Sequence, residues 1–124
     1  MKENSILVDT SIIISQLHGS LSLQAKNILK KRKTAMSVIS FFETCRYYAA
    51  AGRATYWNDV KAELAEIEVL YVSKEIAEMA AALSAQKGLS VADALIYATA
   101  QQNGLILATS DNHFAGLKGV LLLK

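Results

Sequence analysis

The chain has 124 residues, of which 52% are hydrophobic, so it is long and apolar enough for one compact domain with a buried core. That composition excludes an intrinsically disordered tail. Thirteen Lys and Arg oppose eleven Asp and Glu, and the formal net charge of +2 is too mild to identify a nucleic-acid-binding protein. We therefore expect one domain over residues 1–124, whose function depends on the positions of individual charges.

Short apolar runs alternate with helical patterns along the chain. The first half predicts a buried strand over 5–9 that ends in an acid, a helix over 11–17, a helix over 21–33, a strand over 34–38, a helix over 40–51 with Gly52 as its C-cap, and a helix over 54–65. The second half predicts a strand over 67–72, a helix from the N-cap Ser73 to Lys87, a helix over 90–103 closed by Gly104, a strand over 105–108, a turn or short helix over 110–115, and a strand over 120–123.

Strands that alternate with helices, and that are nearly continuous apolar runs, are typical of a parallel sheet covered on both faces. The predicted class is α/β, in the form of a three-layer α/β/α sandwich with a mostly parallel sheet of about five strands.

Two features bear on where the protein works. Cys45 is the only cysteine, so no disulfide can form within the chain, which agrees with a reducing cytoplasm. Residues 1–4 run directly into the apolar segment 6–8, whereas a secretory signal needs roughly 7–15 apolar residues and a spanning helix about 20. We expect a cytoplasmic protein with no membrane segment.

Three acids are predicted to meet at one edge of the sheet. Asp9 and Asp111 each follow an apolar strand, and Glu43 lies in the first turn of the helix after a third strand. In an open parallel sheet the strand-to-helix turns open at the same edge, where ligands usually bind. Asp93 opens a helix that leads into a strand, so the pattern alone does not place it there.

Clustered carboxylates repel one another, and a divalent cation removes the conflict. Mg²⁺ and Mn²⁺ prefer oxygen ligands, and Mg²⁺ is usually held by one or two carboxylates together with phosphate oxygens of the substrate. Such a site activates water and stabilises the charge that develops on a phosphorus centre. The acids therefore suggest phosphodiester hydrolysis, with one or two metal ions left open.

Each acid also has an ordinary structural explanation. Ser40 with Glu43, and Ser90 with Asp93, have the spacing of a capping box, and Asp111 can satisfy the first turn of a short helix. Asp9 is the exception, because a carboxylate at the end of an apolar strand is costly unless it is paired or ligated.

Four segments, in order, resemble the motifs of the PIN-domain family. They are Val8-Asp9-Thr10-Ser11 with the three isoleucines that follow, Val38-Ile39-Ser40 with Glu43, residues 89–96 around Asp93, and residues 107–114 around Asp111, the last in the form T-x-D-x-H-F. Length and element order are also similar, so the resemblance covers nearly the whole chain. By size and motif the chain most resembles the VapC-like toxins of prokaryotic toxin–antitoxin pairs.

The resemblance implies an Mg²⁺- or Mn²⁺-dependent endoribonuclease that forms a homodimer and is inhibited by a small antitoxin protein. It implies an acidic pocket in which Asp9 and Asp93 are the core metal ligands and Glu43 and Asp111 complete the site. It also implies supporting hydroxyl groups, which are that of Thr10 or Ser11 and that of Thr109. Cleavage of RNA by an activated water would leave a 5′-phosphate and a 3′-hydroxyl.

Other groups are interpreted more plainly. The cations of residues 30–33, with Arg46, Arg53 and Lys61, could contact phosphate, but a solvated helix face is the favoured interpretation. Four aromatic residues near the third and fourth helices indicate a core or a partner groove, and in PIN toxins this helical pair often receives the antitoxin; they are Tyr47, Tyr48, Tyr56 and Trp57. His113 is expected to serve packing or a turn hydrogen bond rather than a metal.

Competing enzyme classes fit less well. The chain contains neither G-x-G-x-x-G after a strand nor G-x-x-x-x-G-K-[ST], so a dinucleotide fold and a P-loop lack their phosphate turns. Phosphatases of the haloacid-dehalogenase type need a second Asp where this chain has Ser11. The remaining alternative is a PIN-like RNA-binding or scaffold subunit that does not cut, and the intact acid set argues against it.

Overall fold

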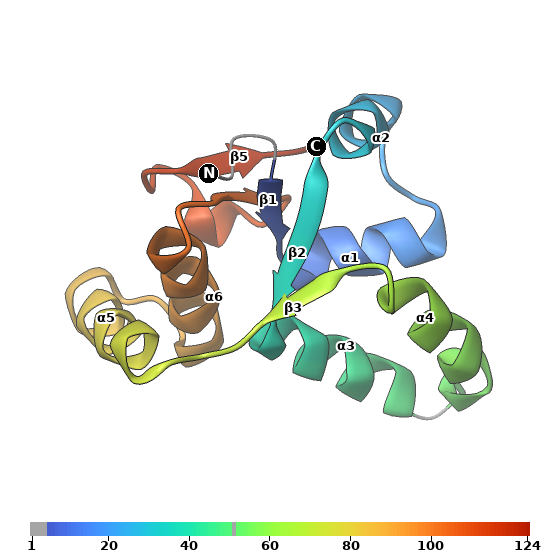
Figure 1. Cartoon of the computed structure of the whole chain (residues 1–124), viewed down its shortest axis with the longest axis horizontal. Coiled ribbons are helices and arrows are strands. Elements are labelled where there is room, and N and C mark those ends of the chain that lie inside the picture. Colours follow the sequence, from blue (N-terminus) through green and yellow to red (C-terminus); the bar gives the residue numbers. More distant parts are fainter. Residues whose placement is uncertain (1–4, 51) are drawn as a thin grey trace.

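A five-stranded parallel sheet forms the centre of the computed structural model, which describes residues 5–50 and 52–124 (Figure 1). The strands lie in the order β3-β2-β1-β4-β5, and all four neighbouring pairs are parallel. Their bounds are β1 (Ser5–Val8), β2 (Lys33–Ser37), β3 (Glu68–Leu70), β4 (Ile106–Thr109) and β5 (Val120–Leu122). The predicted number and direction of the strands are confirmed.

Helices cover both faces of the sheet, as the three-layer prediction requires (Figure 1). They are α1 (Thr10–His18), α2 (Leu23–Lys30), α3 (Val38–Ala49), α4 (Trp57–Leu64), α5 (Lys74–Lys87) and α6 (Val91–Gln102), with two 3₁₀ turns, η1 (Ala54–Tyr56) and η2 (Asn112–Phe114). Among the described residues, no helix is long and apolar enough to cross a membrane.

The alternation of side chains along β1 divides the core into two layers. Ile6 and Val8 pack in the cluster that contains Ile12 and Ile13 of α1, whereas Leu7 packs in the cluster that contains Ile96 of α6. The side chains of Ile6, Leu7 and Val8 are each at most 1% exposed. A strand covered on both faces must be apolar throughout, which explains the continuous run that predicted it.

The start of α3 differs from the prediction. Ser37 is its N-cap, and the Ser37 Oγ accepts a hydrogen bond from the Ile39 N–H at 3.0 Å. The predicted start at residue 40 and the Ser40–Glu43 capping box are therefore wrong, because a serine three residues earlier caps the helix where β2 ends. Glu43 consequently lies in the second turn of α3 rather than the first.

Other helix bounds also change. The C-cap of α3 is Ala50 rather than Gly52, and the predicted final residue, 51, lies outside the described residues. The helix predicted over 21–33 is shorter at both ends, because Ser22 caps α2 and β2 already begins at Lys33. The helix predicted over 54–65 is divided into η1 and α4. The N-cap at Ser73 is confirmed, and Ser90 is likewise an N-cap.

Candidate active site

The four acids singled out in the sequence line one cavity of about 470 Å³. Asp9 follows β1, Glu43 projects from α3, Asp93 lies in the first turn of α6, and Asp111 follows β4. The cavity is completed by residues from α1, α3 and α6, which are Thr10, Ser11, Ile14, Arg46, Tyr47, Ala50 and Ile96. The predicted meeting of remote acids at the carboxyl edge of the sheet is therefore observed.

Asp93 reaches this edge because α6 leads back into β4. A helix that ends where a strand begins must start at the opposite edge, and the 12 residues of α6 span roughly 18 Å. The Ser90 Oγ accepts a hydrogen bond from the Asp93 N–H at 3.1 Å. The backbone of Asp93 thus serves the cap while its carboxylate faces the cavity.

Asp9 is 4% exposed and is held by three donors. Its Oδ1 accepts hydrogen bonds from the Ser11 hydroxyl at 2.6 Å and the Ile12 N–H at 3.2 Å, and its Oδ2 accepts one from the Thr109 hydroxyl at 2.6 Å. Burial raises the pKa of Asp9, the hydrogen bonds oppose that rise, and the charge of Asp111 adds to it. The site therefore stores an electrostatic cost that a bound cation would relieve.

Hydroxyl groups join the turn after β1 to the turn after β4. The Thr109 Oγ1 accepts a hydrogen bond from the Asp111 N–H at 2.9 Å. The Ser11 Oγ accepts one from the Ser110 N–H at 3.2 Å. Both hydroxyls also donate to Asp9, so they set the position of Asp9 relative to Asp111. Ser11 and Thr109 are among the residues for which the family resemblance implied a supporting role, and that role stays a prediction.

Glu43 is oriented from α1. The Thr10 hydroxyl donates a hydrogen bond to Glu43 Oε1 across the cavity wall. A capping interaction would have turned this carboxylate back onto its own helix, but Ser37 already fills that role. The side chain of Glu43 is therefore available to the cavity, with its orientation set by Thr10.

His113 lies beside two of the acids. Its Nδ1 is 3.4 Å from Asp111 Oδ1 and 3.5 Å from Asp93 Oδ2. Of the two predicted alternatives, packing or a turn hydrogen bond, the structure has the second: the His113 N–H donates to Asp111 Oδ1 at 2.9 Å, and the side chain is 75% exposed. The sequence feature that places the His113 ring beside Asp111 is the spacing D-x-H, because a single 3₁₀ turn follows Asp111.

One potential ligand atom from each of Asp93, Asp111 and His113 lies within 4.8 Å of the others. Carboxylate oxygens suit Mg²⁺ and Mn²⁺, and an imidazole nitrogen favours transition metals over Mg²⁺. The donor set therefore fits a divalent cation. Of the two core ligands that the resemblance implied, this group contains Asp93 but not Asp9. The Asp9 carboxylate is more deeply buried and accepts hydrogen bonds from the hydroxyl groups of Ser11 and Thr109.

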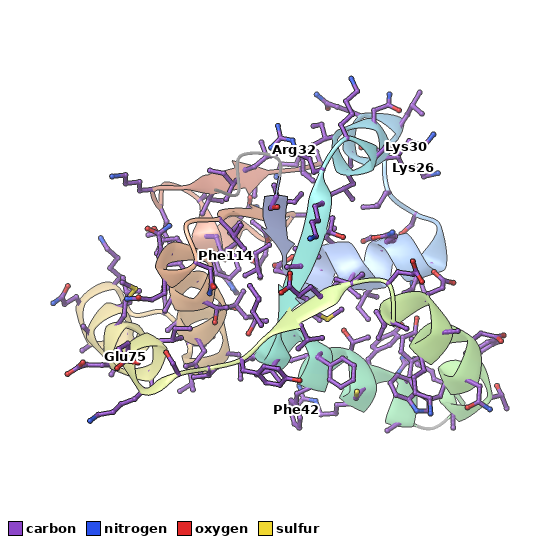
Figure 2. All side chains as sticks on the ribbon, in the orientation of Figure 1. Lys26, Lys30, Arg32, Phe42, Glu75 and Phe114 are labelled. Carbon is purple, nitrogen blue, oxygen red and sulfur yellow. The ribbon has the colours of Figure 1, made fainter. Side chains whose placement is uncertain are left out.

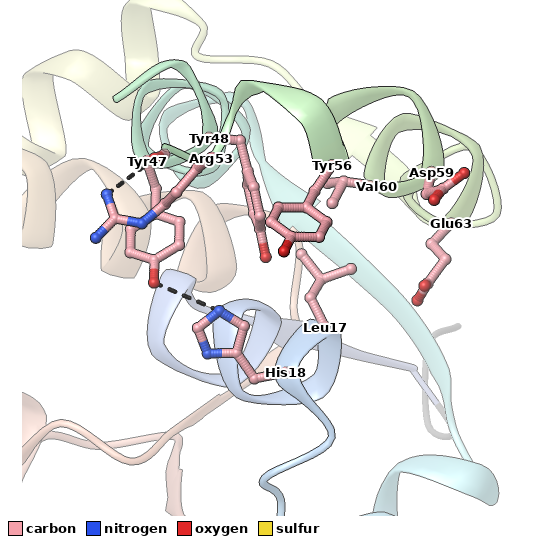
Figure 3. A pocket seen from close by; sticks show the side chains of 9 residues that line it. All are labelled: Leu17, His18, Tyr47, Tyr48, Arg53, Tyr56, Asp59, Val60 and Glu63. Atoms are coloured by element: carbon pink, nitrogen blue, oxygen red, sulfur yellow. Dashed lines mark hydrogen bonds between the residues drawn. The ribbon is translucent and has the colours of Figure 1, made fainter. Parts of the chain in front are cut away.

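Tyr47 lines both the acid cavity and a second cavity of about 490 Å³ between α1, α3 and α4. Figure 3 shows the residues that line this second cavity. The Tyr47 hydroxyl lies 3.4 Å from His18 Nε2, and the Arg53 guanidinium lies 4.0 Å from the Tyr47 ring centroid. Three of the four predicted aromatic residues line this second cavity, whereas Trp57 packs against the core. Those three are Tyr47, Tyr48 and Tyr56.

Comparisons with known proteins agree with this geometry. A family model described as PIN domain matches residues 6–120. A toxin–antitoxin complex from Klebsiella pneumoniae is similar with a TM-score of 0.80 and 31% identity over 94% of this chain and 95% of that chain. VapBC-5 from Mycobacterium tuberculosis, a member of the VapBC family of toxin–antitoxin systems, has a TM-score of 0.69 and 26% identity over 98% of each chain.

A DNA-bound VapBC from Salmonella typhimurium shares the fold, with a TM-score of 0.80 and 18% identity over 98% of this chain and 97% of that chain. A comparison with curated protein sequences finds no match.

Proposed function

This chain belongs to the PIN domain family, and we propose that it is a metal-dependent endoribonuclease that serves as the VapC-like toxin of a toxin–antitoxin pair. The observation that carries the proposal is the meeting of four acids, remote in sequence, in one cavity. We propose that residues 1–124 form one nuclease domain, which acts in the cytoplasm as a homodimer.

The proposed cofactor is Mg²⁺ or Mn²⁺. Asp93 and Asp111 would hold the ion, with His113 beside them, and Asp9 and Glu43 would complete the site. When bound, the ion lowers the pKa of a water molecule and offsets the charge that develops on the phosphate oxygens.

The residues of the chain have separate roles in this mechanism. Ser11 and Thr109 keep the Asp9 carboxylate directed at the neighbourhood of Asp111, and Thr10 does the same for Glu43. Because these hydrogen bonds already hold Asp9 and Glu43, the two side chains lose little freedom when the substrate binds, and the site is organised before the reaction begins. Hydrolysis breaks the bond between phosphorus and the 3′ oxygen and leaves a 5′-phosphate and a 3′-hydroxyl.

Arg46 supplies the positive charge of the cavity. Its guanidinium lies 5.7 Å from the ring centroid of Phe42, and in residues 5–50 and 52–124 the ion pairs all involve His113 rather than Arg46. An arginine that no carboxylate neutralises is suited to a phosphate oxygen, which it can bind with two parallel hydrogen bonds. Arg46 is therefore the proposed contact for the RNA backbone next to the acids.

The proposed protein partner is a small antitoxin. The likeness to the toxin–antitoxin complex from Klebsiella pneumoniae supports such a partner. The cavity lined by tyrosines is the proposed docking groove, because it is large, partly apolar and adjacent to the acids. A gene for a small DNA-binding protein next to the gene of this chain would support the pairing.

A direct test measures RNA cleavage by the purified chain with Mn²⁺, with EDTA, and after the substitution Asp9→Asn. We expect cleavage with Mn²⁺ only, and a loss of at least about 100-fold in the variant. Asp59→Asn, an exposed acid of α4, is the matched control and should keep full activity. Cleavage that continues unchanged in EDTA would reject the metal mechanism. An absence of cleavage under all conditions would favour the alternative, an RNA-binding or scaffold subunit.

A further inference from the structure

The ring of His113 faces two acids, although the turn in which it lies uses only its backbone. The His113 N–H donates to Asp111 Oδ1 at 2.9 Å, and this contact needs no atom of the ring. The ring atom Nδ1 nevertheless lies 3.4 Å from Asp111 Oδ1 and 3.5 Å from Asp93 Oδ2. The imidazole is therefore directed at two carboxylates and remains available for a further role.

The two distances from Nδ1 fit ligands of one cation better than they fit hydrogen bonds. Both are longer than the usual N–H···O distance of about 2.7–3.2 Å. Two ligand atoms that each lie roughly 2.1 Å from a metal ion are about 3.0 Å apart at a right angle and about 3.4 Å apart at the tetrahedral angle. One potential ligand atom from each of Asp93, Asp111 and His113 lies within 4.8 Å of the others, so the three side chains can surround a single ion.

The 3₁₀ turn η2 holds His113 in this place before an ion binds. The next residue, Phe114, is fully buried and packs in the cluster that contains Ile96 of α6 (Figure 2). Asp111, the N-cap of η2, donates its own N–H to the Thr109 hydroxyl. The backbone is thus anchored on both sides of His113, and a ligand that is already held loses little freedom on binding.

These three side chains define a position for the cation at the outer side of the acids. The exposed fraction of the side chain is 19% for Asp93, 35% for Asp111 and 75% for His113. Asp93 lines the acid cavity and also a neighbouring cavity of about 300 Å³, which His113 lines as well. An ion held here is accessible from solvent, so water or phosphate oxygens can complete its coordination.

We infer that His113 is a direct ligand of the cation, together with Asp93 and Asp111, and that its imidazole makes the site prefer Mn²⁺ to Mg²⁺. This inference rests on the proposed metal-dependent function and decides between the two ions that it leaves open. An imidazole nitrogen suits transition-metal ions, whereas Mg²⁺ favours oxygen ligands and keeps several water molecules. A site built from carboxylates alone would discriminate less between the two ions.

The first test measures the binding of Mn²⁺ and of Mg²⁺ by calorimetry, without RNA, to the wild type, to His113→Ala and to the control His18→Ala. His18 is the other histidine of the chain and is also exposed. We expect the wild type to bind Mn²⁺ more tightly than Mg²⁺. His113→Ala should weaken Mn²⁺ binding by about tenfold or more and Mg²⁺ binding by less than about threefold, since water can replace the lost nitrogen on Mg²⁺. The control should keep both affinities.

The variant His113→Asn separates the ring nitrogen from a side-chain donor in general. Asparagine offers an amide oxygen at the δ position, so Mg²⁺ affinity should remain while the preference for Mn²⁺ falls. Pulsed electron paramagnetic resonance of bound Mn²⁺ gives a direct readout, because a nitrogen ligand modulates the electron spin echo. This nitrogen modulation should be present in the wild type and in His18→Ala, and absent in His113→Ala.

Several outcomes would overturn the inference. They are a wild-type Mn²⁺ complex without nitrogen modulation, equal losses of Mn²⁺ and Mg²⁺ affinity in His113→Ala, no loss of either, and a wild type that binds neither ion. RNA cleavage, measured separately with Mn²⁺ and with EDTA, tests the proposed function. If the wild type binds Mn²⁺ through nitrogen but cuts no RNA, the ribonuclease function fails and the inference holds. Thermal unfolding of each variant in EDTA verifies that the exposed substitutions leave the fold intact.

Discussion

The two edges of the sheet carry charge in opposite ways. At the carboxyl edge, Asp9 is 4% exposed and accepts three hydrogen bonds, so its position is determined by the fold. At the amino edge, Lys30 and Lys31 are exposed and form no ion pair with any acid of residues 5–50 and 52–124. The fold therefore fixes the charged groups at one edge, whereas it leaves the lysine side chains at the other edge in solvent.

The largest expected effect is on RNA cleavage and Mn²⁺ binding, which we expect to depend on the carboxyl edge and not on the amino edge. Asp93→Asn should lower RNA cleavage by at least about 100-fold, or roughly 2.7 kcal/mol of transition-state stabilisation, and should weaken Mn²⁺ binding measured by calorimetry. The variant Lys30→Gln, Lys31→Gln, at the amino edge, should bind Mn²⁺ like the wild type. If both variants lost Mn²⁺ affinity equally, the separation of roles between the two edges would be wrong.

A second prediction concerns the rigidity of the acid edge. Thr109→Val removes a donor from the buried Asp9 and should lower the free energy of unfolding by about 1–3 kcal/mol, because a buried charged group loses a partner. Thr44→Val is the control, since that buried hydroxyl donates only to the Ser40 carbonyl within α3. Urea unfolding should show a clearly smaller cost for Thr44→Val; equal costs would contradict the special role of Asp9.

A third prediction tests whether a cation at the acid edge acts locally. Arg46→Ala should raise KM for RNA about tenfold, or roughly 1.4 kcal/mol, because a cation beside the cut strand is lost. Arg53→Ala, on the far side of Tyr47, is the control for loss of an arginine charge. A KM that rises equally in both variants would argue against the place of Arg46 beside the cut strand.

The smallest effect follows from the pKa of Asp9, which burial raises above its usual value of 3.8. The folded state then holds the proton more tightly than the unfolded state, so ionised Asp9 destabilises the fold as pH rises through the folded pKa. Without metal, Asp9→Asn should therefore stabilise the protein at pH 7 by about 1 kcal/mol, a few degrees in Tm. The gain should vanish below about pH 3.8 and reverse with Mn²⁺. A variant less stable than wild type in metal-free buffer at pH 7 would contradict this.

The sequence predicts most of the architecture because its signals are local. The apolar run before Asp9 needs two covered faces, and Ser73 and Ser90 cap their helices with side chains close in the chain. The start of α3 could not be chosen locally, because Ser37 and Ser40 both precede apolar residues. The choice depends on where β2 stops pairing with β3, and Ser37 is the last paired residue.

The site could also be predicted only where the signals are local. Asp9, Glu43 and Asp111 could be placed at one edge because each follows a predicted strand. The position of Asp93 depends on the direction in which α6 crosses the sheet, which the sequence pattern does not give. The orientation of His113 toward two carboxylates depends on a ring exposed at a 3₁₀ turn, and no periodicity predicts it. The roles of these residues in metal binding and cleavage remain predictions.

The hydrogen bond from Thr109 to Asp9 joins residues 100 positions apart, at the two ends of translation. Asp9 is synthesised early, whereas its donor Thr109 follows 100 residues later. The proposed active site therefore cannot assemble on the ribosome until the turn after β4 has emerged, and an N-terminal fragment that ends before Thr109 lacks it.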